Sequence, residues 1–323
     1  YADGQKATVK TTGSIARNVP QQASASSTVG TAVVFESANT VFVSATFDSN
    51  SNKVVIAYRD KGNSEYGTAV VGTVSGTSVS FGTPVVFESA SSRLFSPTFD
   101  SNSNKVVIAY RDDGNGQQGT AIVGTVSGTS ISFGSPTVFE SAVVTTISAT
   151  FDSSNNKVVI AYTDDGNSEH GTAIVGTVSG TSISFGSATV FESASSNSIS
   201  ATFDSSNNKV VIAYADVGNS TYGTAIVGTV SGTSISFGSA VVFESASSQH
   251  ISATFDSDAN KVVVGYQDQN NSNHGTAIVG TVSGTSISFG SPTVFNAGGT
   301  ERISPIYDSN AQKVVIGYRD GGN

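Results

Sequence analysis

The chain has 323 residues, of which 37% are hydrophobic and only 12% charged, with a formal net charge of −9 and no Cys, Met or Trp. The acidic balance argues against nucleic acid as a partner and against insertion into an anionic membrane, and the lack of cysteine excludes disulfides and thiolate metal sites. No apolar run approaches the ~18 residues of a membrane-spanning helix, and a chain that starts at Tyr1 without any methionine is expected to be a processed product or a piece of a longer protein.

The first 28 residues differ from the rest and are expected to form an N-terminal segment, 1–28. Within it, residues 5–13 (QKATVKTTG) alternate apolar and polar side chains and form a candidate strand. Residues 14–28 are rich in Ser, Ala and Gln and are expected to be a flexible loop. Residues 29–38 (VGTAVVFESA) match residues 81–90 (FGTPVVFESA) and predict the first strand of the main domain.

A repeat covers the main domain, residues 29–323. Its clearest marker is the aspartate of the "FDS" or "YDS" motif, which recurs every 52 residues at Asp48, Asp100, Asp152, Asp204, Asp256 and Asp308. Such a period, combined with low charge and abundant Val, Ile, Thr, Phe and Gly, indicates an all-β repeat protein.

Residues 147–194 show the elements of one unit. "ISATFDS" alternates as a first strand should, and "NKVVIAYTD" is nearly continuous apolar, as in a strand buried on both faces. "GTAIVGTVSG" predicts a third strand, and "TSISFGSATVFES" a fourth with a bulge or bend at its Gly-Ser. The joints between them carry the Gly, Asn and Asp of turns. The repeated apolar residues, three phenylalanines per unit among them, are expected to form the core.

Four such strands predict an antiparallel blade, and the chain predicts a six-bladed β-propeller with a 52-residue repeat. The complete units are 43–90, 95–142, 147–194, 199–246 and 251–298. The sixth has two strands within 303–320 and is expected to be completed by 5–13 and 29–38. Both termini would then close the last blade and hide its strand edges. The alternative is a slice of a longer, open array.

The joints differ in how much they vary among units. The joint between first and second strands ("DSNSNK", "DSSNNK") and the joint between third and fourth ("SGTS") hardly change. The other two joints change in every unit, as in "RDKGNSEYG" against "QDQNNSNHG". In an antiparallel blade these variable joints, residues 37–42 and 59–67 with their equivalents every 52 residues, emerge together and form what we call the diversified face. Loops on a rigid scaffold commonly carry binding residues, so we predict a binding surface there; drift in unconstrained loops is the alternative.

The side chains of the diversified face suit sugar recognition, and guanidinium groups suit carboxylate or sulfate. The predicted ligand-binding residues are Arg59, Tyr66, Arg93, Arg111, Gln118, His170, Tyr222, His250, Gln267, His274, Arg302 and Arg319. The five arginines belong to units that adjoin once the ring closes, and they predict a basic crescent. Ion pairs with Glu65, Asp113 and Glu301 are the alternative.

No catalytic residue, metal site or cofactor is predicted. "DSNSN" resembles half of a calcium loop, but the glycine and the distal glutamate are missing and an Asx turn explains it. The aspartates Asp60, Asp112, Asp164, Asp216, Asp268 and Asp320 recur in every unit, which indicates turn caps. An enzyme needs one asymmetric constellation, and His170 beside Glu169 and Asp165 is interpreted as incidental.

The segments "ISATFDSSNNKVVIAYTDDGNS" and "GTAIVGTVSGTSISFGSPTVFES" resemble repeats of virion proteins from marine bacteriophages of the cyanophage type. The opening "ADGQKATVKTTGSIARNVP" is similar to the segment that precedes those repeats. The resemblance implies a phage tail fibre or virion-surface protein, located on the virion or outside the cell, with a host-surface glycan or receptor and other virion proteins as partners. The chain departs from the pattern at 296–302 ("NAGGTER"), where Asn296 replaces the usual Glu, so this joint is expected to be specialised.

We therefore expect a non-enzymatic module that binds a cell-surface receptor or glycan through the diversified face. A structural spacer or decoration protein of a virion is the alternative, and a polysaccharide depolymerase is the third hypothesis.

Overall fold

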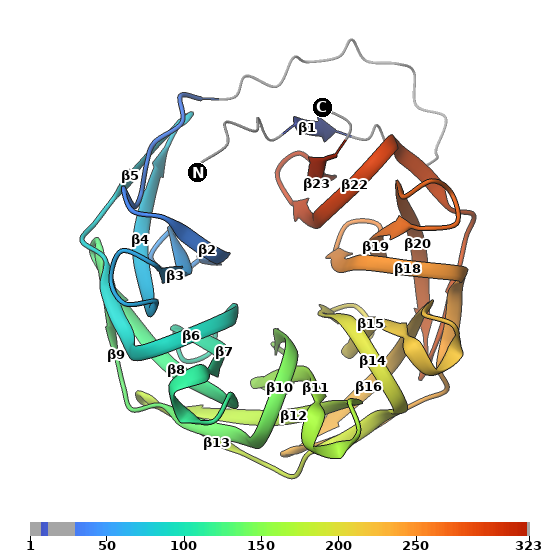
Figure 1. Cartoon of the computed structure of the whole chain (residues 1–323), viewed down its shortest axis with the longest axis horizontal. Helices are drawn as coiled ribbons and strands as arrows, with labels where there is room; N and C mark the ends of the chain where they lie inside the picture. Colours follow the sequence, from blue (N-terminus) through green and yellow to red (C-terminus); the bar gives the residue numbers. More distant parts are fainter. Residues whose placement is uncertain (1–7, 12–29, 322–323) are drawn as a thin grey trace.

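The computed structural model describes residues 8–11 and 30–321 of the chain. Antiparallel sheets stand around a central axis and form a propeller-like ring (Figure 1). Sheet formation follows from the sequence, because β-branched residues dominate the segments between the Gly, Asn and Asp turns. The expected all-β, antiparallel class is confirmed.

The strands fall into classes that repeat with the sequence. The second strands of the units are β3 (Lys53–Asp60), β7 (Lys105–Asp112), β11 (Lys157–Asp164), β15 (Lys209–Asp216), β19 (Lys261–Asp268) and β23 (Lys313–Asp320). The third strands are β4 (Tyr66–Ser75), β8 (Gln118–Ser127), β12 (His170–Ser179), β16 (Tyr222–Ser231) and β20 (His274–Ser283). Each third strand turns back into a short strand: β5 (Ser78–Phe81), β9 (Ser130–Phe133), β13 (Ser182–Phe185), β17 (Ser234–Phe237) or β21 (Ser286–Phe289).

Long strands link the units. They are β6 (Val85–Asp100), β10 (Thr137–Asp152), β14 (Thr189–Asp204), β18 (Val241–Asp256) and β22 (Thr293–Asp308). The other elements are β1 (Thr8–Thr11), β2 (Thr40–Asp48) and three short 3-10 turns, η1 (Asp113–Asn115), η2 (Asp165–Asn167) and η3 (Val217–Asn219).

Each long strand belongs to two neighbouring sheets. In β6, residues 85–91 pair with β4 and residues 92–100 pair with β7. The register shifts between Arg93 and Ser96, where Leu94 has a φ of 60°. The predicted loop between the fourth strand of one unit and the first strand of the next is therefore wrong. This joint is a bulged, continuous strand, because the bulge absorbs the change of partner without ending the ladder.

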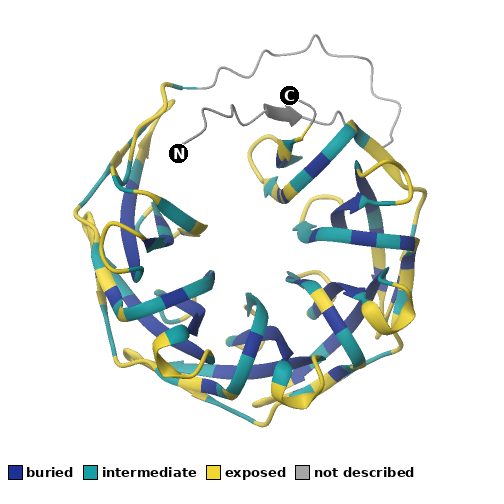
Figure 2. Cartoon of the chain, in the orientation of Figure 1, coloured by how far each residue is buried: buried dark blue, intermediate teal, exposed yellow. Residues whose placement is uncertain are grey.

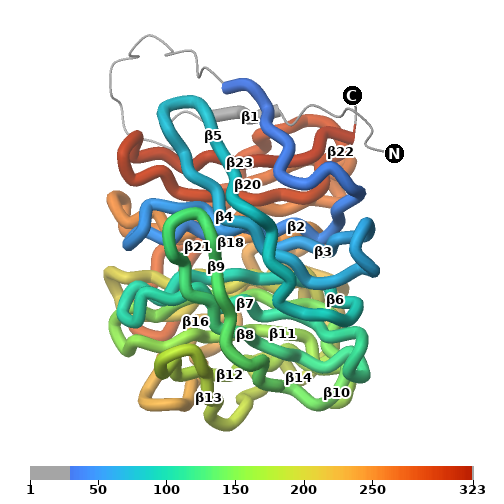
Figure 3. The backbone as a smooth tube through the Cα atoms, turned by 90° about the vertical axis from the view of Figure 1, so that its left-hand side faces the viewer, coloured from blue at the N-terminus to red at the C-terminus, as the bar shows by residue number. Residues whose placement is uncertain are grey.

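The predicted fourth strand is split in two. In the first unit, β4 pairs through residues 72–75 with β5 and through residues 66–69 with β6. Residues 82–84 between them belong to no strand, so the expected bend is a complete break. From the side, the β4–β5 and β8–β9 hairpins follow one another along the wall of the ring (Figure 3).

The hydrophobic core lies between neighbouring sheets. Val55 and Ala57 of β3 cluster with Phe87 of β6 and with Ile108 and Tyr110 of β7, and all five are at most 8% exposed. The rings of Phe87 and Tyr110 meet edge to face with centroids 5.4 Å apart. Equivalent clusters recur at the following junctions, and Figure 2 shows the buried segments repeating around the ring. The prediction that the repeated apolar residues form the core is confirmed.

Both aspartate series cap turns. Asp152 Oδ1 accepts hydrogen bonds from the backbone N–H groups of Ser154 and Asn155, at 2.9 and 3.0 Å. Asp60 Oδ1 accepts from Gly62 N at 2.9 Å, and further members of both series make equivalent bonds. These carboxylates thus satisfy backbone donors that a tight turn leaves without partners, which confirms the predicted capping role for them. Asp164 is an exception, because its side chain makes no cap hydrogen bond with η2.

The sixth unit is only partly assembled from the described residues. β22 pairs with β23, and β1 pairs with the other edge of β23, with Val9 opposite Gly317. Residues 8–11, within the candidate strand 5–13, thus form β1 in the position of a third strand. Residues 30–38, part of the strand predicted at 29–38, have no ladder partner among the described residues. The sheet is consequently not closed, and the predicted loop 14–28 lies outside the described residues.

Residues 30–38 nevertheless lie against the first unit as fourth strands lie against other units. The rings of Phe35 and Tyr58 are 5.2 Å apart, and Tyr58 Oη donates to Glu36 Oε2 at 3.3 Å. Phe87 and Glu88 contact Tyr110 in the same way at the next junction. The side chains thus reproduce the inter-unit contact without the ladder.

Candidate functional site

The variable joints contact one another, as predicted. Ser195 Oγ donates to Glu169 Oε2 at 2.6 Å, and Ser247 Oγ donates to Gln269 Oε1 at 2.5 Å. In each pair the serine lies in the middle of a long strand, and the acceptor lies in the turn between second and third strands. At these two places the two kinds of variable joint therefore lie next to each other on the diversified face.

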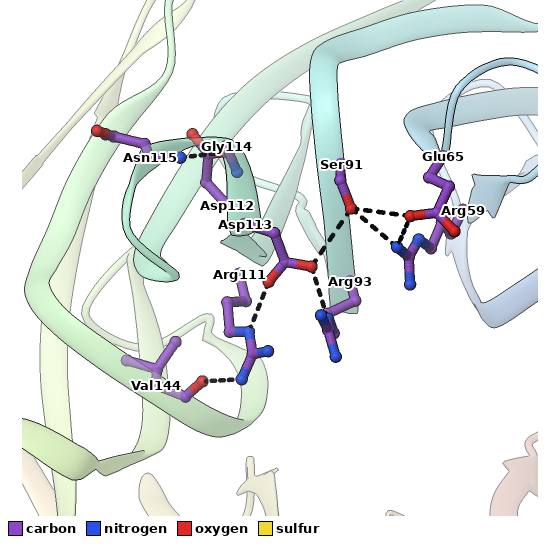
Figure 4. Close-up of polar contacts among 10 residues, drawn as sticks. All are labelled: Arg59, Glu65, Ser91, Arg93, Arg111, Asp112, Asp113, Gly114, Asn115 and Val144. Carbon is purple, nitrogen blue, oxygen red and sulfur yellow. Dashed lines mark hydrogen bonds and ion pairs between the residues drawn. The ribbon is translucent and has the colours of Figure 1, made fainter.

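The first and second units meet in a cluster of charges on this face, which we call the arginine cluster: Arg59, Glu65, Arg93, Arg111 and Asp113 (Figure 4). Arg59 Nη2 donates to Glu65 Oε2 and, at 2.8 Å, to Ser91 Oγ. Asp113 accepts from Arg93 Nε at 2.6 Å and from Arg111 Nε at 2.9 Å, one with each oxygen. Ser91 Oγ lies 3.3 Å from Glu65 Oε2 and 3.4 Å from Asp113 Oδ2, so it connects the two halves.

Local backbone structure positions the acid at the centre of the cluster. Asp112 ends β7 and accepts hydrogen bonds from the N–H groups of Gly114 and Asn115, which caps η1. Asp113 is the first residue of η1, so the cap orients its carboxylate toward the two arginines. Burial, followed by the charge of Glu88, raises the pKa of Asp112.

The residue that follows the tyrosine of each second strand has a structural role at several junctions. Arg111 Nη1 donates to Val144 O at 3.1 Å, Thr163 Oγ1 to Ser196 O at 2.8 Å, and Gln267 Nε2 to Thr300 O at 2.7 Å. Each bond reaches a carbonyl of the next long strand, 33 residues later. Arg111 and Gln267 are buried, at 8% and 7% exposed, and their hydrogen bonds join neighbouring units. This structural role is independent of any ligand that they bind.

The residues at the start of the third strands are half-buried on the diversified face: Tyr66, Gln118, His170, Tyr222 and His274. Two residues with positive φ precede each of them, as with Ser168 at 55° and Glu169 at 61°. This left-handed backbone is unfavourable for residues other than glycine, yet it recurs in every complete unit. The scaffold is thus constant while the side chain it presents varies, and a ligand-binding role for these residues stays a prediction.

The arginines of the last unit are separate from the arginine cluster. Arg319 Nη1 lies 3.1 Å from Glu301 Oε2, and Arg302 is exposed. Burial, and then the nearby Arg302 charge, lower the pKa of half-buried His250. The alternative pairings with Glu65, Asp113 and Glu301 all form, and a basic crescent that joins all five arginines stays a prediction.

Next to the variable joints, buried tyrosines pair with glutamates of the long strands, a feature that the sequence analysis missed. Tyr162 Oη donates to Glu140 Oε2 at 3.1 Å, while Glu140 Oε1 accepts from Ala142 N at 2.9 Å. Burial, followed by the glutamate charge, raises the pKa of Tyr162 and of its equivalents. The constant separation of 22 residues between glutamate and tyrosine was the sequence signal that could have predicted these pairs.

The last such pair is missing, which agrees with the expected specialisation of 296–302. Asn296 replaces the glutamate, is 8% exposed, and donates to Thr300 Oγ1 at 2.9 Å instead. The buried hydroxyl of Tyr318 consequently has no hydrogen-bond partner among the described residues.

The two acids that neighbour His170 in the sequence make their side-chain hydrogen bonds elsewhere, while Asp164 lies opposite His170 in the ladder. Glu169 binds Ser195, and Asp165 Oδ1 lies 3.4 Å from Thr145 Oγ1, so neither carboxylate is hydrogen-bonded to the histidine. Its Nδ1 is buried without a partner within the described part of the chain. That part also contains no group of three or more His, Asp or Glu placed to hold a metal ion, and no helix long and apolar enough to cross a membrane.

The centre of the ring contains a cavity of about 470 Å³. It is lined mainly by the Thr-Phe ends of the innermost strands, such as Thr98 and Phe99, and by Ile306 and Tyr307 in the last unit. These residues precede the constant turns, so the cavity lies toward the face opposite the variable joints.

Comparisons with known proteins support the fold and leave the family open. No family model matches the chain, and no curated protein matches it. Among solved structures, AofleA from Arthrobotrys oligospora has a TM-score of 0.55 at 9% identity, covering 86% of this chain and 79% of that one. The SapL1 lectin in complex with alpha methyl fucoside has a TM-score of 0.49 at 14% identity, covering 83% and 86%.

A mutant of Trypanosoma rangeli sialidase that displays trans-sialidase activity also has a TM-score of 0.49, at 12% identity, and the match covers 87% of this chain but 54% of that one. At such identities the similarity concerns the fold alone. AofleA, with its TM-score above 0.5, supports the propeller-like architecture.

Proposed function

We propose that this chain is a non-enzymatic binding module that recognises a cell-surface glycan or another receptor through the diversified face. The observation that carries the proposal is the contrast between the two ends of the sheets. At one end the turns repeat almost unchanged, while at the other end a constant backbone presents different side chains in each unit. Drift would be expected to alter both exposed ends alike.

The use of the carboxylates supports binding over catalysis. Those of the two aspartate series bond turn backbone, as at Asp60 and Asp152, and the glutamates of the long strands bond tyrosines, as at Glu140. An acid–base pair for a depolymerase would have to come from the variable joints. A structural spacer is the second candidate, because the continuous long strands and the apolar clusters between units favour a rigid body.

The biological setting proposed is the surface of a phage particle, where the chain would contact the host envelope together with other virion proteins. This part of the proposal depends on the resemblance of the repeats to virion proteins of marine phages. Weak sites repeated around the ring, or on several rings of one fibre, would gain avidity from one another.

We also propose that the ring has six blades and is closed by both termini. Gly30 lies so close to Thr77 that a Cβ on it would be 1.8 Å from the Thr77 carbonyl oxygen, and Gly82 stands in the same relation to Thr129. Phe35 also contacts Tyr58. Both contacts support the interpretation that residues 30–38 follow the path of a fourth strand. β1 already occupies the third-strand position on β23. Pairing of β1 with residues 30–38 would complete the blade.

The 52-residue period predicts which residues meet at the closure. In the first unit Ala57 is opposite Ala69, which is opposite Val85; the corresponding residues are Gly317, Val9 and Val33. Because the chain has no cysteine of its own, the variant Val9→Cys/Val33→Cys should form one intramolecular disulfide. The disulfide should raise the free energy of unfolding by about 3 kcal/mol, the chain-entropy estimate for a loop of this order, and Tm should rise with it. The control Val9→Cys/Val85→Cys, one unit further on, should stay reduced. Equal reactivity of both variants would contradict closure.

Binding itself is tested with a glycan array and whole cells of marine cyanobacteria, using joints already present in the chain. The turn between the second and third strands of each other unit is replaced, one at a time, by that of the fourth unit. In the third unit the variant is Asp165→Val/Glu169→Thr/His170→Tyr. The backbone accepts both sequences, so Tm should change little, while at least one exchange should abolish saturable binding. Exchanges between the "DSNSN" and "DSSNN" turns of the constant face serve as controls. A parent chain that binds no glycan and no cell would favour the spacer.

A further inference from the structure

We infer that the arginine cluster is a subsite for an oxyanion, a carboxylate or sulfate group carried by the glycan; this inference depends on the proposed function. Three guanidinium groups from two units converge there on two carboxylates. In Figure 4 the ends of Arg59, Arg93 and Arg111 lie on the same side of the line formed by Glu65, Ser91 and Asp113. The acids therefore lie on one side of the three guanidinium groups, each of which bonds an acid through one nitrogen atom.

The internal pairing leaves positive charge and donors in excess. Three arginines face Glu65 and Asp113, so the cluster has a net charge of about +1 when all its groups are ionised. Arg93 uses only Nε and Arg111 uses Nε and Nη1, so Nη1 and Nη2 of Arg93 and Nη2 of Arg111 make no hydrogen bond within the described residues. Planar guanidinium edges of this kind match the oxygen atoms of carboxylate and sulfate.

These donors are held in place and remain accessible. Arg111 is 8% exposed and anchored to Val144 O, whereas the Arg93 side chain is 35% exposed. The nitrogen atoms of Arg93 and Arg111 that lack a partner are not closed off from solvent. Arg59 differs, because its Nε is buried without a partner among the described residues. Asp113 engages Nε of both arginines at once, which keeps their free edges in one orientation before any ligand arrives. Such preorganisation lowers the ordering cost of binding.

The cluster is unique to this junction among those that the structure describes. In the positions of Arg93, Arg111 and Asp113, the third unit has Thr145, Thr163 and Asp165, and the fourth has Asn197, Ala215 and Val217. Neither set contains a cation. At the position of Arg111, the scaffold needs only a hydrogen-bond donor to a carbonyl of the next long strand. Thr163 supplies that donor in the third unit. Three cations at one junction therefore exceed what the fold requires, and recognition of an anion accounts for them.

The test compares the parent chain with Arg93→Gln, which removes the most exposed cation and leaves Arg111 to bond Asp113. The charge-matched control is Lys105→Gln, which lies at the opposite end of β7. The probes are matched neutral, uronate-containing and sulfated oligosaccharides on an array, followed by titration calorimetry at low and high salt. Inorganic sulfate is titrated separately while Tm is followed.

We expect Arg93→Gln to weaken binding of the anionic oligosaccharides ~10-fold or more, in proportion to the lost charge-assisted hydrogen bonds, with neutral ones unchanged. Lys105→Gln should bind like the parent. Millimolar sulfate should raise the Tm of the parent and of Lys105→Gln more than that of Arg93→Gln. Preference for uronate or for sulfate ester identifies the group.

The outcomes separate the two proposals. Glycan binding that is equal for neutral and anionic probes, or unaffected by Arg93→Gln, overturns the oxyanion subsite and leaves the binding module standing. A sulfate effect on Tm that depends on Arg93, without binding of any glycan or cell, overturns the glycan-binding function and with it the assignment of this subsite to a glycan. Absence of both effects overturns both proposals.

Discussion

Replacing Gly186 by alanine is expected to destabilise the protein by about 3 kcal/mol or more, because the new methyl group would overlap backbone of the next unit. A Cβ at this position would lie 2.0 Å from the carbonyl oxygen of Thr233 and 2.9 Å from its carbonyl carbon. Backbone held in a hairpin cannot move aside as a flexible side chain can. Urea unfolding followed by circular dichroism should show a lower midpoint with little change in slope.

The chain supplies a matched control at the corresponding glycine of the fifth unit. Among the described residues, a Cβ on Gly290 would meet only the carbonyl oxygen of Val279, at 3.8 Å. Gly290→Ala should therefore cost far less than Gly186→Ala. Similar losses for both would mean either that Gly290 contacts residues outside the described ranges, as ring closure requires, or that the contact between Gly186 and Thr233 does not limit stability.

Replacing Tyr162 by phenylalanine should lower the free energy of unfolding by about 1.5–3 kcal/mol, the range for a hydrogen bond to a charged group. The ring, which is 0% exposed, would keep its contact with Phe139. The lost hydroxyl, however, would leave Glu140 Oε2 without its partner. Thermal or urea unfolding measures the difference.

Tyr318→Phe is the corresponding change where the glutamate is absent. The Tyr318 hydroxyl is buried without a partner among the described residues, so removing it should be neutral or stabilising. If Tyr318→Phe cost as much as Tyr162→Phe, the hydroxyl would have a partner outside the described residues, and the loss in Tyr162→Phe could not be attributed to Glu140 alone.

The position after the tyrosine of each second strand shows how scaffold and recognition overlap. Thr163 and Gln267 there each bond a carbonyl of the next unit, and Arg111 makes the same bond while keeping a further nitrogen free. Variation at this position thus mixes two constraints. Changing Arg111 would disturb the junction as well as any ligand, which is why Arg93 is the better position for a binding test.

The sequence alone determined the elements of the fold that depend on local order and periodicity. A 52-residue period, alternation within "ISATFDS" and the Asp-Ser-Asn turns predicted the strands, the capping aspartates and the core. These features follow from short-range preferences repeated in identical form, so each copy confirms the others. The same comparison separated a constant end of the sheets from a variable one.

Only the tertiary structure decided how the variable positions are used. Whether Arg111 faces a ligand or Val144 O depends on a carbonyl 33 residues away that the packing of two units brings within 3.1 Å. The extended path through Arg93 and Leu94 likewise depends on a bulge between two ladders, since Ser and Asn in such a joint also suit a loop. Side-chain type restricts the possible partners, but distances across the junctions select among them, and those distances exist only once the sheets have packed.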